Sequence, residues 1–170
     1  MSQSKLAVII LQYNKSFLTG SLLRSIHQFE QAGNFHIVVA DNHSTEDDSF
    51  EQFKKEFPAV VFKKNNENLG FARGINKEVI ELPAGIDYIL LINNDIVLHD
   101  NSITQCLEQM KMLHADAVTC RMLHDDGNEL NNFSSGLSVG SFIFFNLTGL
   151  SALWRKWIRR RKKPSRVYSI

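Results

Sequence analysis

The feature that most constrains this chain is an apolar run that ends abruptly in three polar residues. Tyr88 to Ile92 is uninterrupted by polar or charged side chains other than the tyrosine hydroxyl, and Asn93, Asn94 and Asp95 follow directly. Such a run predicts a strand buried on both faces, as in parallel sheets covered by helices. Desolvating a carboxylate inside that strand would be costly, so we expect Asp95 just beyond its carboxyl end. A strand-ending turn is the plain alternative, because Asn and Asp favour turns.

The rest of the chain alternates between strand-like and helix-like segments. Further strands are predicted over residues 6–11, 35–40, from 60 onward and over 117–119. Helices with one apolar face are predicted over residues 17–29, 46–57, 71–82 and 102–113, the second capped by Ser44 or Thr45. Repeated strand–helix–strand units imply an α/β fold with a doubly wound, mostly parallel sheet.

Polar clusters recur where the predicted strands end. Asn14, residues 41–45 and residues 93–95 follow three different strands, and the carboxyl ends of parallel strands meet at one edge of a sheet. A fourth segment, residues 68–76, is a glycine loop leading into a helix, where backbone N–H groups and Arg73 suit an anion. Gly70 and Gly74 also have plain explanations, namely positive φ and close helix packing. Together the clusters favour a nucleotide site.

Length, charge and cysteine content narrow the class of protein. The 170 residues are most simply one domain, with an ordinary hydrophobic fraction of 44%. All 18 acidic residues lie in the first 153, whereas residues 154–170 carry eight of the 19 basic ones. Cys106 and Cys120 have neither metal-ligand nor disulfide-framework spacing, and we expect small buried thiols in a reducing compartment. No cleavable signal is visible at the N-terminus.

Four segments, read in order, resemble a known family. They are residues 8–14 (VIILQYN), 38–45 (VVADNHST), 68–76 (NLGFARGIN) and 91–95 (LINND). The chain is similar to the N-terminal part of inverting family-two nucleotide-sugar glycosyltransferases of the GT-A fold, with rhamnosyltransferase-like members nearest. The similarity covers about residues 6–127. It implies a nucleotide-sugar-binding α/β domain over residues 1–135, followed by an apolar and then basic segment over 136–170.

The resemblance also implies roles for particular residues. Asp41 would accept a hydrogen bond from a pyrimidine N–H, and Asp95 would coordinate Mg²⁺ or Mn²⁺ bridging the donor diphosphate. Asn93 replaces the first acid of the family's acid-x-acid motif, as in the rhamnosyltransferase-like subgroup. The residues assigned to the nucleotide sugar are Gln12, Tyr13, Asn14, Asp41, Asn42, Ser44, Gly70, Arg73, Asn93 and Asn94, with Asp95 as the metal ligand.

No catalytic base is recognisable. Inverting transfer needs a general base, which in this family belongs to an acidic pair further along the chain. The nearest pair here, Asp125 and Asp126, precedes Gly127 and is typical of a turn. We therefore expect a truncated or split product, or a donor-binding half, that is inactive alone. The alternatives are a non-catalytic nucleotide-sugar-binding or membrane-associated remnant and, more weakly, a metal-dependent nucleotidyltransferase.

The C-terminal segment bears on partners and location. Apolar residues 142–153 precede Trp154, Trp157 and a basic run, a composition typical of an interfacial helix on an anionic membrane. A connector to an absent segment is the alternative that we favour. The expected partners are a nucleoside-diphosphate sugar and a glycan or lipid-linked acceptor, with no nucleic acid. The expected location is cytoplasmic, peripheral at the inner face of the cell membrane.

Overall fold

Within the residues that the structure describes, four parallel strands form the central sheet. The structure, a computed structural model, describes residues 5–45, 50–124 and 126–129. The chain divides into two compact units, Met1–Thr104 and Gln105–Ile170. The strands are β1 (Leu6–Gln12), β2 (Phe35–Asp41), β3 (Val61–Lys64) and β4 (Tyr88–Asn93). The helices are α1 (Ser16–Phe29), η1 (Ala32–Asn34), α2 (Phe50–Glu56), α3 (Gly70–Ile80) and α4 (Ser102–Met112).

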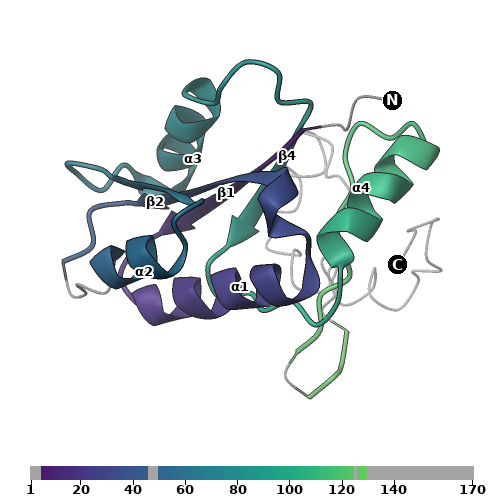
Figure 1. The fold of residues 1–170 in the computed structure, drawn as a ribbon, viewed down its shortest axis with the longest axis horizontal. Coiled ribbons are helices and arrows are strands. Elements are labelled where there is room, and N and C mark those ends of the chain that lie inside the picture. The colour runs from purple at the N-terminus through teal and green to yellow at the C-terminus, as the bar shows by residue number, and fades with distance from the viewer. Residues whose placement is uncertain (1–4, 46–49, 125, 130–170) are drawn as a thin grey trace, which may run out of the picture. The chain divides into compact units, whose positions relative to one another are not determined.

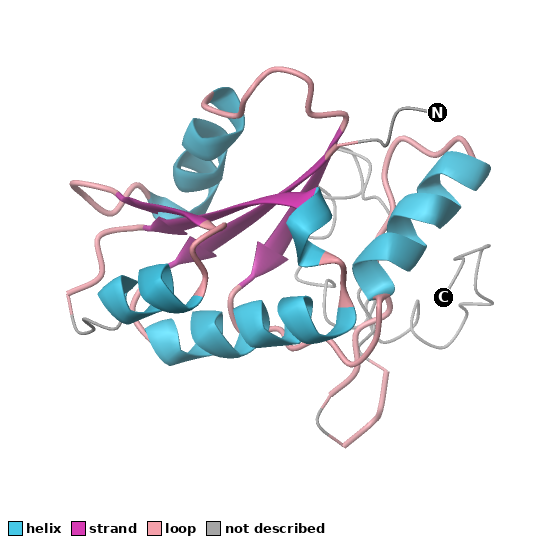
Figure 2. Ribbon diagram, in the orientation of Figure 1, coloured by secondary structure: helices cyan, strands magenta, loops and turns pink. Residues whose placement is uncertain are grey.

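The strand order is β3-β2-β1-β4, and each neighbouring pair is parallel. β1 is therefore central and its two neighbours come from distant parts of the chain. This arrangement confirms the predicted α/β class with a parallel sheet. Figure 2 shows the strands running side by side with helices on both faces.

One face of the sheet packs against α1 and α2, which lie together below the strands in Figure 1. Val8 and Ile10 of β1 meet Leu22, Leu23 and Ile26 of α1 in one cluster of fully buried side chains. The predicted apolar stripe of α2 is confirmed, because Phe50, Phe53 and Phe57 belong to the same core. Phe17 is the exception in α1, since 62% of its surface is exposed although its spacing predicted burial.

The other face is covered by α3, which lies above the sheet in Figure 1. Gly74 sits so close to β1 that an added Cβ would lie 2.9 Å from Leu11 Cδ1. Lys63 of β3 forms ion pairs of 2.9 Å with buried Glu78 of α3 and of 2.7 Å with Glu81, which directly follows α3. Its partial burial lowers the pKa of Lys63, but the hydrogen bonds from Lys63 to Glu81 and Glu78 outweigh this effect and leave the pKa raised.

The prediction that the strand at Tyr88 is buried on both faces is wrong. Its residues alternate between half-buried and exposed, and Ile89 and Leu91 are 45% and 50% exposed. Tyr88, Leu90 and Ile92 pack against the core on the α1 side. β4 is the outermost of the described strands on its side of the sheet, and α3 lies over β1 and β2 instead. An apolar run indicates a hydrophobic strand, but the elements packed against the strand determine which of its faces are covered.

A second correction concerns residues 117–119, predicted to be a strand. They adopt no strand, because they pair with none of the described strands. A single antiparallel bridge joins Leu123 to Glu129 further along. Between them Gly127 has φ 80° and its N–H donates to the carbonyl of His124, which confirms the turn predicted at Asp126 and Gly127. Asp125 and the predicted helical turn at 46–48 lie outside the described residues.

Within the described residues, no helix has the length and apolar character needed to cross a membrane. The segment 136–170, with its basic run, is not among them.

Candidate functional site

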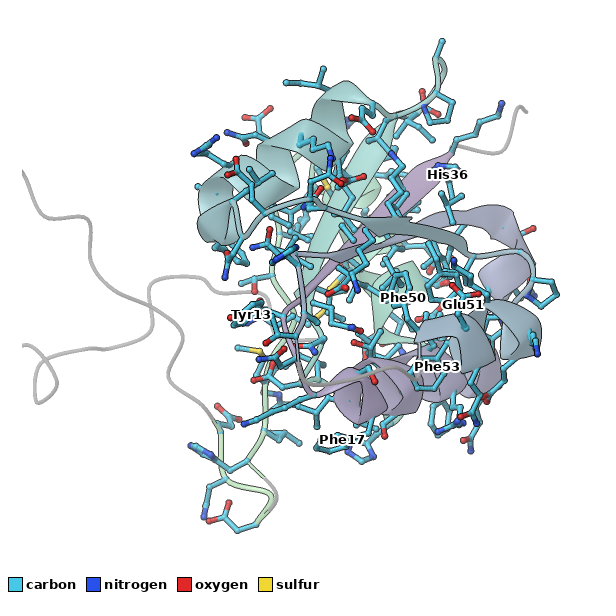
Figure 3. All side chains as sticks on the ribbon, turned by 90° about the vertical axis from the view of Figure 1, so that its left-hand side faces the viewer. Tyr13, Phe17, His36, Phe50, Glu51 and Phe53 are labelled. Carbon is cyan, nitrogen blue, oxygen red and sulfur yellow. The ribbon has the colours of Figure 1, made fainter. Side chains whose placement is uncertain are left out.

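The polar residues that follow three strands gather at one edge of the sheet. The register places Gln12 of β1 opposite Asp41 of β2, and Leu11 of β1 opposite Asn93 of β4. The ends of β2 and β4 therefore flank the end of β1, although they lie about fifty residues apart in sequence. Figure 3 shows Tyr13 at this carboxyl end of the sheet and His36 at the opposite end.

Hydrogen bonds tie the loop after β1 to the loop after β2. The N–H of Asn14 donates to Ser44 Oγ at 2.7 Å, and the N–H of Thr45 donates to Asn14 Oδ1 at 3.0 Å. Asn14, Lys15 and His43 all have positive φ, between 51° and 69°. Left-handed conformations of non-glycine residues are uncommon and gather at functional sites. These two loops are held in an uncommon conformation by their own side chains.

Asp41 is 2% exposed and is fixed by its neighbours. Its Oδ1 accepts hydrogen bonds from the hydroxyl and the backbone N–H of Ser44. Its Oδ2 lies 3.7 Å from Lys64 Nζ at the end of β3. Oδ1 is therefore occupied within the protein, whereas Oδ2 has this longer contact. Gln12 beside it is 1% exposed, and its buried Oε1 has no hydrogen-bond partner in the part of the chain that the structure describes.

Asn42 uses its whole side-chain amide within the protein. Its Nδ2 donates to Asn68 Oδ1 at 2.7 Å, while its Oδ1 accepts from Leu69 N–H at 3.0 Å and Asn65 Nδ2 at 3.3 Å. The N–H of Gly70 (φ 71°) is also occupied, donating to Asn68 Oδ1 at 2.9 Å. Two N–H groups of the glycine loop are thus bonded to side-chain oxygens of the protein.

The turn after β4 presents an exposed carboxylate at this edge. Asn93 and Asp95 are exposed, and Asn94 between them donates from Nδ2 to Thr19 Oγ1 of α1 at 3.2 Å. Among the residues that the structure describes, no group of three or more His, Cys, Asp or Glu side chains could hold a metal ion. Asp95 is therefore a single carboxylate, which suits a cation whose other ligands are phosphate and water.

Two further predicted residues are exposed. Tyr13 is 51% exposed, and the Arg73 guanidinium is 3.9 Å from Glu67 with three quarters of its side chain in solvent. Glu67 therefore holds the Arg73 side chain only weakly, since such an exposed ion pair contributes little to stability. The exposed residues of the predicted set are thus accessible to a ligand from solvent, whereas the buried ones are held by contacts within the protein.

The sequence interpretation missed Lys64, Asn65 and Lys77. Lys64 and Asn65 stand at the end of β3, where the same edge rule that found Asp41 would have found them. The N–H of Asn65 donates to the carbonyl of Asp41 at 2.8 Å, which brings this strand end to the others. Lys77 donates to Asn65 Oδ1 at 2.6 Å from α3, a contact that no local pattern indicates.

The parallel sheet with a polar carboxyl edge defines the class of this protein: doubly wound α/β proteins, which place their ligands at that edge. Residues 7–164 match the model of glycosyl transferase family 2, so the chain belongs to that family. No functionally curated protein is significantly similar to it in sequence.

Solved structures support the GT-A-like fold. The structure of Staphylococcus aureus TarS has a TM-score of 0.63 and 19% sequence identity over 75% of this chain and 23% of that one. TarS 1–349 in complex with UDP has a TM-score of 0.61 and 19% identity over 78% and 38%. The mannosyltransferase PcManGT from Pyrobaculum calidifontis, in complex with GDP-Man and Mn²⁺, has a TM-score of 0.54 and 16% identity over 64% and 33%. The chain thus spans well under half of these structures.

Proposed function

We propose that this chain is the donor-binding part of a glycosyltransferase. It would bind a nucleoside-diphosphate sugar for transfer, with inversion, to a glycan or lipid-linked acceptor. The register that brings Asp41 and Asn93 to either side of the end of β1 carries this proposal. Family membership supports glycosyl transfer, and TarS and PcManGT are known in complex with UDP-GlcNAc and GDP-Man respectively.

The assignment divides the edge by chemistry. Asp41, next to Lys64, would accept an N–H of the base through Oδ2. Exposed Arg73 would meet the phosphates, since a guanidinium matches their geometry. Tyr13 offers an exposed ring against which a base stacks. Ser44 contributes by positioning Asp41, because its hydroxyl and its backbone N–H both donate to Asp41 Oδ1. Gln12 offers the donor its buried Oε1, which lacks a hydrogen-bond partner among the described residues.

Asp95 is the proposed ligand of a divalent cation. Magnesium uses only one or two protein carboxylates alongside substrate phosphates, so a single exposed acid is sufficient. A bound cation would supply positive charge for the leaving diphosphate. Asn93 stands in place of a second acid, so the site has one negative charge fewer. For that reason we retain the rhamnosyltransferase-like assignment within this proposal.

Calorimetric titration tests the donor site. Wild-type chain is titrated with UDP and with GDP, each with and without Mn²⁺, and compared with Asp95→Ala and Asp87→Ala. Asp87 lies just before β4 at the opposite end of the strand, where it accepts from the N–H of Lys5 at 2.9 Å, and serves as the matched control. We expect Mn²⁺-dependent binding of UDP that weakens at least about tenfold in Asp95→Ala and is unchanged in Asp87→Ala.

Each alternative result removes a defined part of the proposal. Equal affinity with and without Mn²⁺ would remove the metal assignment, and preference for GDP would remove the pyrimidine assignment. Absence of binding to either nucleotide would reject the donor site. Sugar transfer by the isolated chain would show that it contains its own catalytic base.

A membrane-bound acceptor would suit the basic C-terminal residues. The eight basic residues of 154–170 would be attracted to an anionic membrane surface. Each would contribute about 1 kcal/mol to the binding free energy near the membrane. Sedimentation with vesicles containing anionic lipid, compared with neutral vesicles, tests this peripheral contact. Equal sedimentation with both would reject an electrostatic one.

A further inference from the structure

We propose that Asn42, Asn65 and Lys77 are positioning residues that hold the loop 65–70 against the carboxyl end of β2. The inference deepens the proposed function and rests on it, since that loop leads into α3, whose first turn carries Gly70 and Arg73. It assigns Asn42 a different task from the ligand contact expected from sequence. It also gives a function to Asn65 and Lys77.

The loop is tied at three successive points. The backbone N–H of Asn65 donates to the carbonyl of Asp41, so the loop starts at the end of β2. The Asn42 amide then joins Asn65, Asn68 and the N–H of Leu69. Asn42 and Asn65 are each 3% exposed. Hydrogen bonds between buried side-chain amides hold one geometry, because breaking them leaves buried polar groups unpaired.

Lys77 closes the chain of contacts from the helix side. Its ammonium donates to Asn65 Oδ1 at 2.6 Å, one helical turn beyond Arg73 on α3. The bond is charge-assisted, which makes it shorter and stronger than a neutral one. Lys77 therefore couples the start of the loop, Asn65, to the helix that follows the loop. With both ends joined, Gly70 and Arg73 keep a defined place relative to Asp41.

Lys77 is the best position at which to remove one of these contacts, because its side chain is half-buried. Loss of its ammonium should leave the core intact. The test uses the full chain with Lys77→Met, which keeps the aliphatic stem, and Lys77→Arg, which keeps a donor and the charge. Lys55→Met, at an exposed position of α2, is the control for removal of one positive charge. Amide hydrogen exchange of residues 65–70 is measured without nucleotide, and UDP affinity is measured with Mn²⁺.

We expect faster exchange in the loop and about tenfold weaker UDP binding in Lys77→Met, with the melting temperature close to wild type. Lys77→Arg should restore both readouts to within about twofold, and Lys55→Met should match wild type. Unchanged loop exchange in Lys77→Met would overturn the inference, as would a UDP affinity equal to wild type. If the wild type binds no UDP, the proposed function fails. The exchange measurement still tests whether Lys77 holds the loop 65–70 in place.

Discussion

The backbone N–H of Asn14 lies 2.7 Å from Ser44 Oγ, across 30 residues of sequence. The same hydroxyl donates to Asp41 Oδ1, so one serine joins the loop after β1 to the carboxylate that ends β2. Ser44 is 7% exposed, and its hydroxyl therefore has no ready replacement by water. This serine determines how the two loops meet.

Replacement of Ser44 by alanine should lower the free energy of unfolding by about 1–3 kcal/mol. The change removes the acceptor of the Asn14 N–H and one of the two hydrogen bonds to Asp41 Oδ1, which still accepts the backbone N–H of residue 44. Urea denaturation measures the effect. Ser21→Ala is the control, since the Ser21 hydroxyl makes only an exposed bond to the carbonyl of Phe17, and it should change stability by less than about 0.5 kcal/mol.

Glu30 caps the start of α4 from the end of α1. Its Oε1 accepts from the N–H of Ile103 at 2.7 Å and its Oε2 accepts from Thr104 Oγ1 at 2.6 Å. Glu30→Ala should destabilise the protein by about 1–2 kcal/mol, as for loss of a helix cap. Glu67→Ala, at an acid with 73% of its side chain exposed, should have little effect. Equal denaturation midpoints for the two variants would contradict the capping role.

Gly20 lets α2 approach α1. A Cβ at this position would lie 2.6 Å from ring carbons of Phe53, which is itself 4% exposed and has no room to move. Gly20→Ala should therefore destabilise by about 1–3 kcal/mol despite the better helix propensity of alanine. At Gly33 nothing lies within 4 Å of the same atom, so Gly33→Ala should be neutral or slightly stabilising. A thermal melt that ranks Gly20→Ala above wild type would refute this account.

Acid should remove the contribution of the pair between Arg24 and Glu56. Hydrogen bonds of 2.7 and 2.8 Å from Arg24 hold the pKa of Glu56 below its ordinary value of 4.5. Because the folded-state pKa is depressed, the stabilisation is fully present above about 4.5 and is lost as pH falls through the folded value. Glu56→Gln should be less stable than wild type near neutral pH and converge with it in acid. A difference in stability that persisted in acid would count against the ion pair as its source.

Cys106 and Cys120 should form a disulfide on mild oxidation. Their sulfur atoms are 2.9 Å apart, and both side chains are half-buried, whereas we expected small buried thiols. Oxidised glutathione would take two electrons from the pair and leave as two reduced thiols. Intact-mass measurement should show the loss of two hydrogens, reversed by dithiothreitol and absent in Cys106→Ser. Persistent labelling of both cysteines by maleimide after oxidation would contradict the proximity.

Strand and helix positions were predictable because their signals are local. β1, β2, α1, α3 and α4 fall within a few residues of their expected bounds, since apolar periodicity depends on the backbone repeat. The coverage of β4 was not predictable, because exposure of Ile89 and Leu91 depends on which elements lie over them. Phe17 is a similar case: it follows the helical period of α1 and yet faces solvent.

The site divides in the same way. Asp41 and Asp95 could be picked out by their places after apolar strands, and the rule for parallel sheets brought them to one edge. The partners of Asp41, the occupied amide of Asn42 and the contact of Lys77 with Asn65 had no counterpart in any local pattern. Hydrogen bonds between side chains depend on distances within a few tenths of an ångström, which residue spacing does not encode.

By itself the amino-acid sequence determined the order of strands and helices, the parallel α/β class and the edge at which polar residues collect. These follow from hydrophobic periodicity and chirality, which act along short stretches of chain. Only the tertiary structure decided that Asp95 is exposed, that Asp41 is buried, and that Asn42 binds a loop of its own chain. Burial and side-chain partners are set by segments distant in sequence, and only folding brings those segments together.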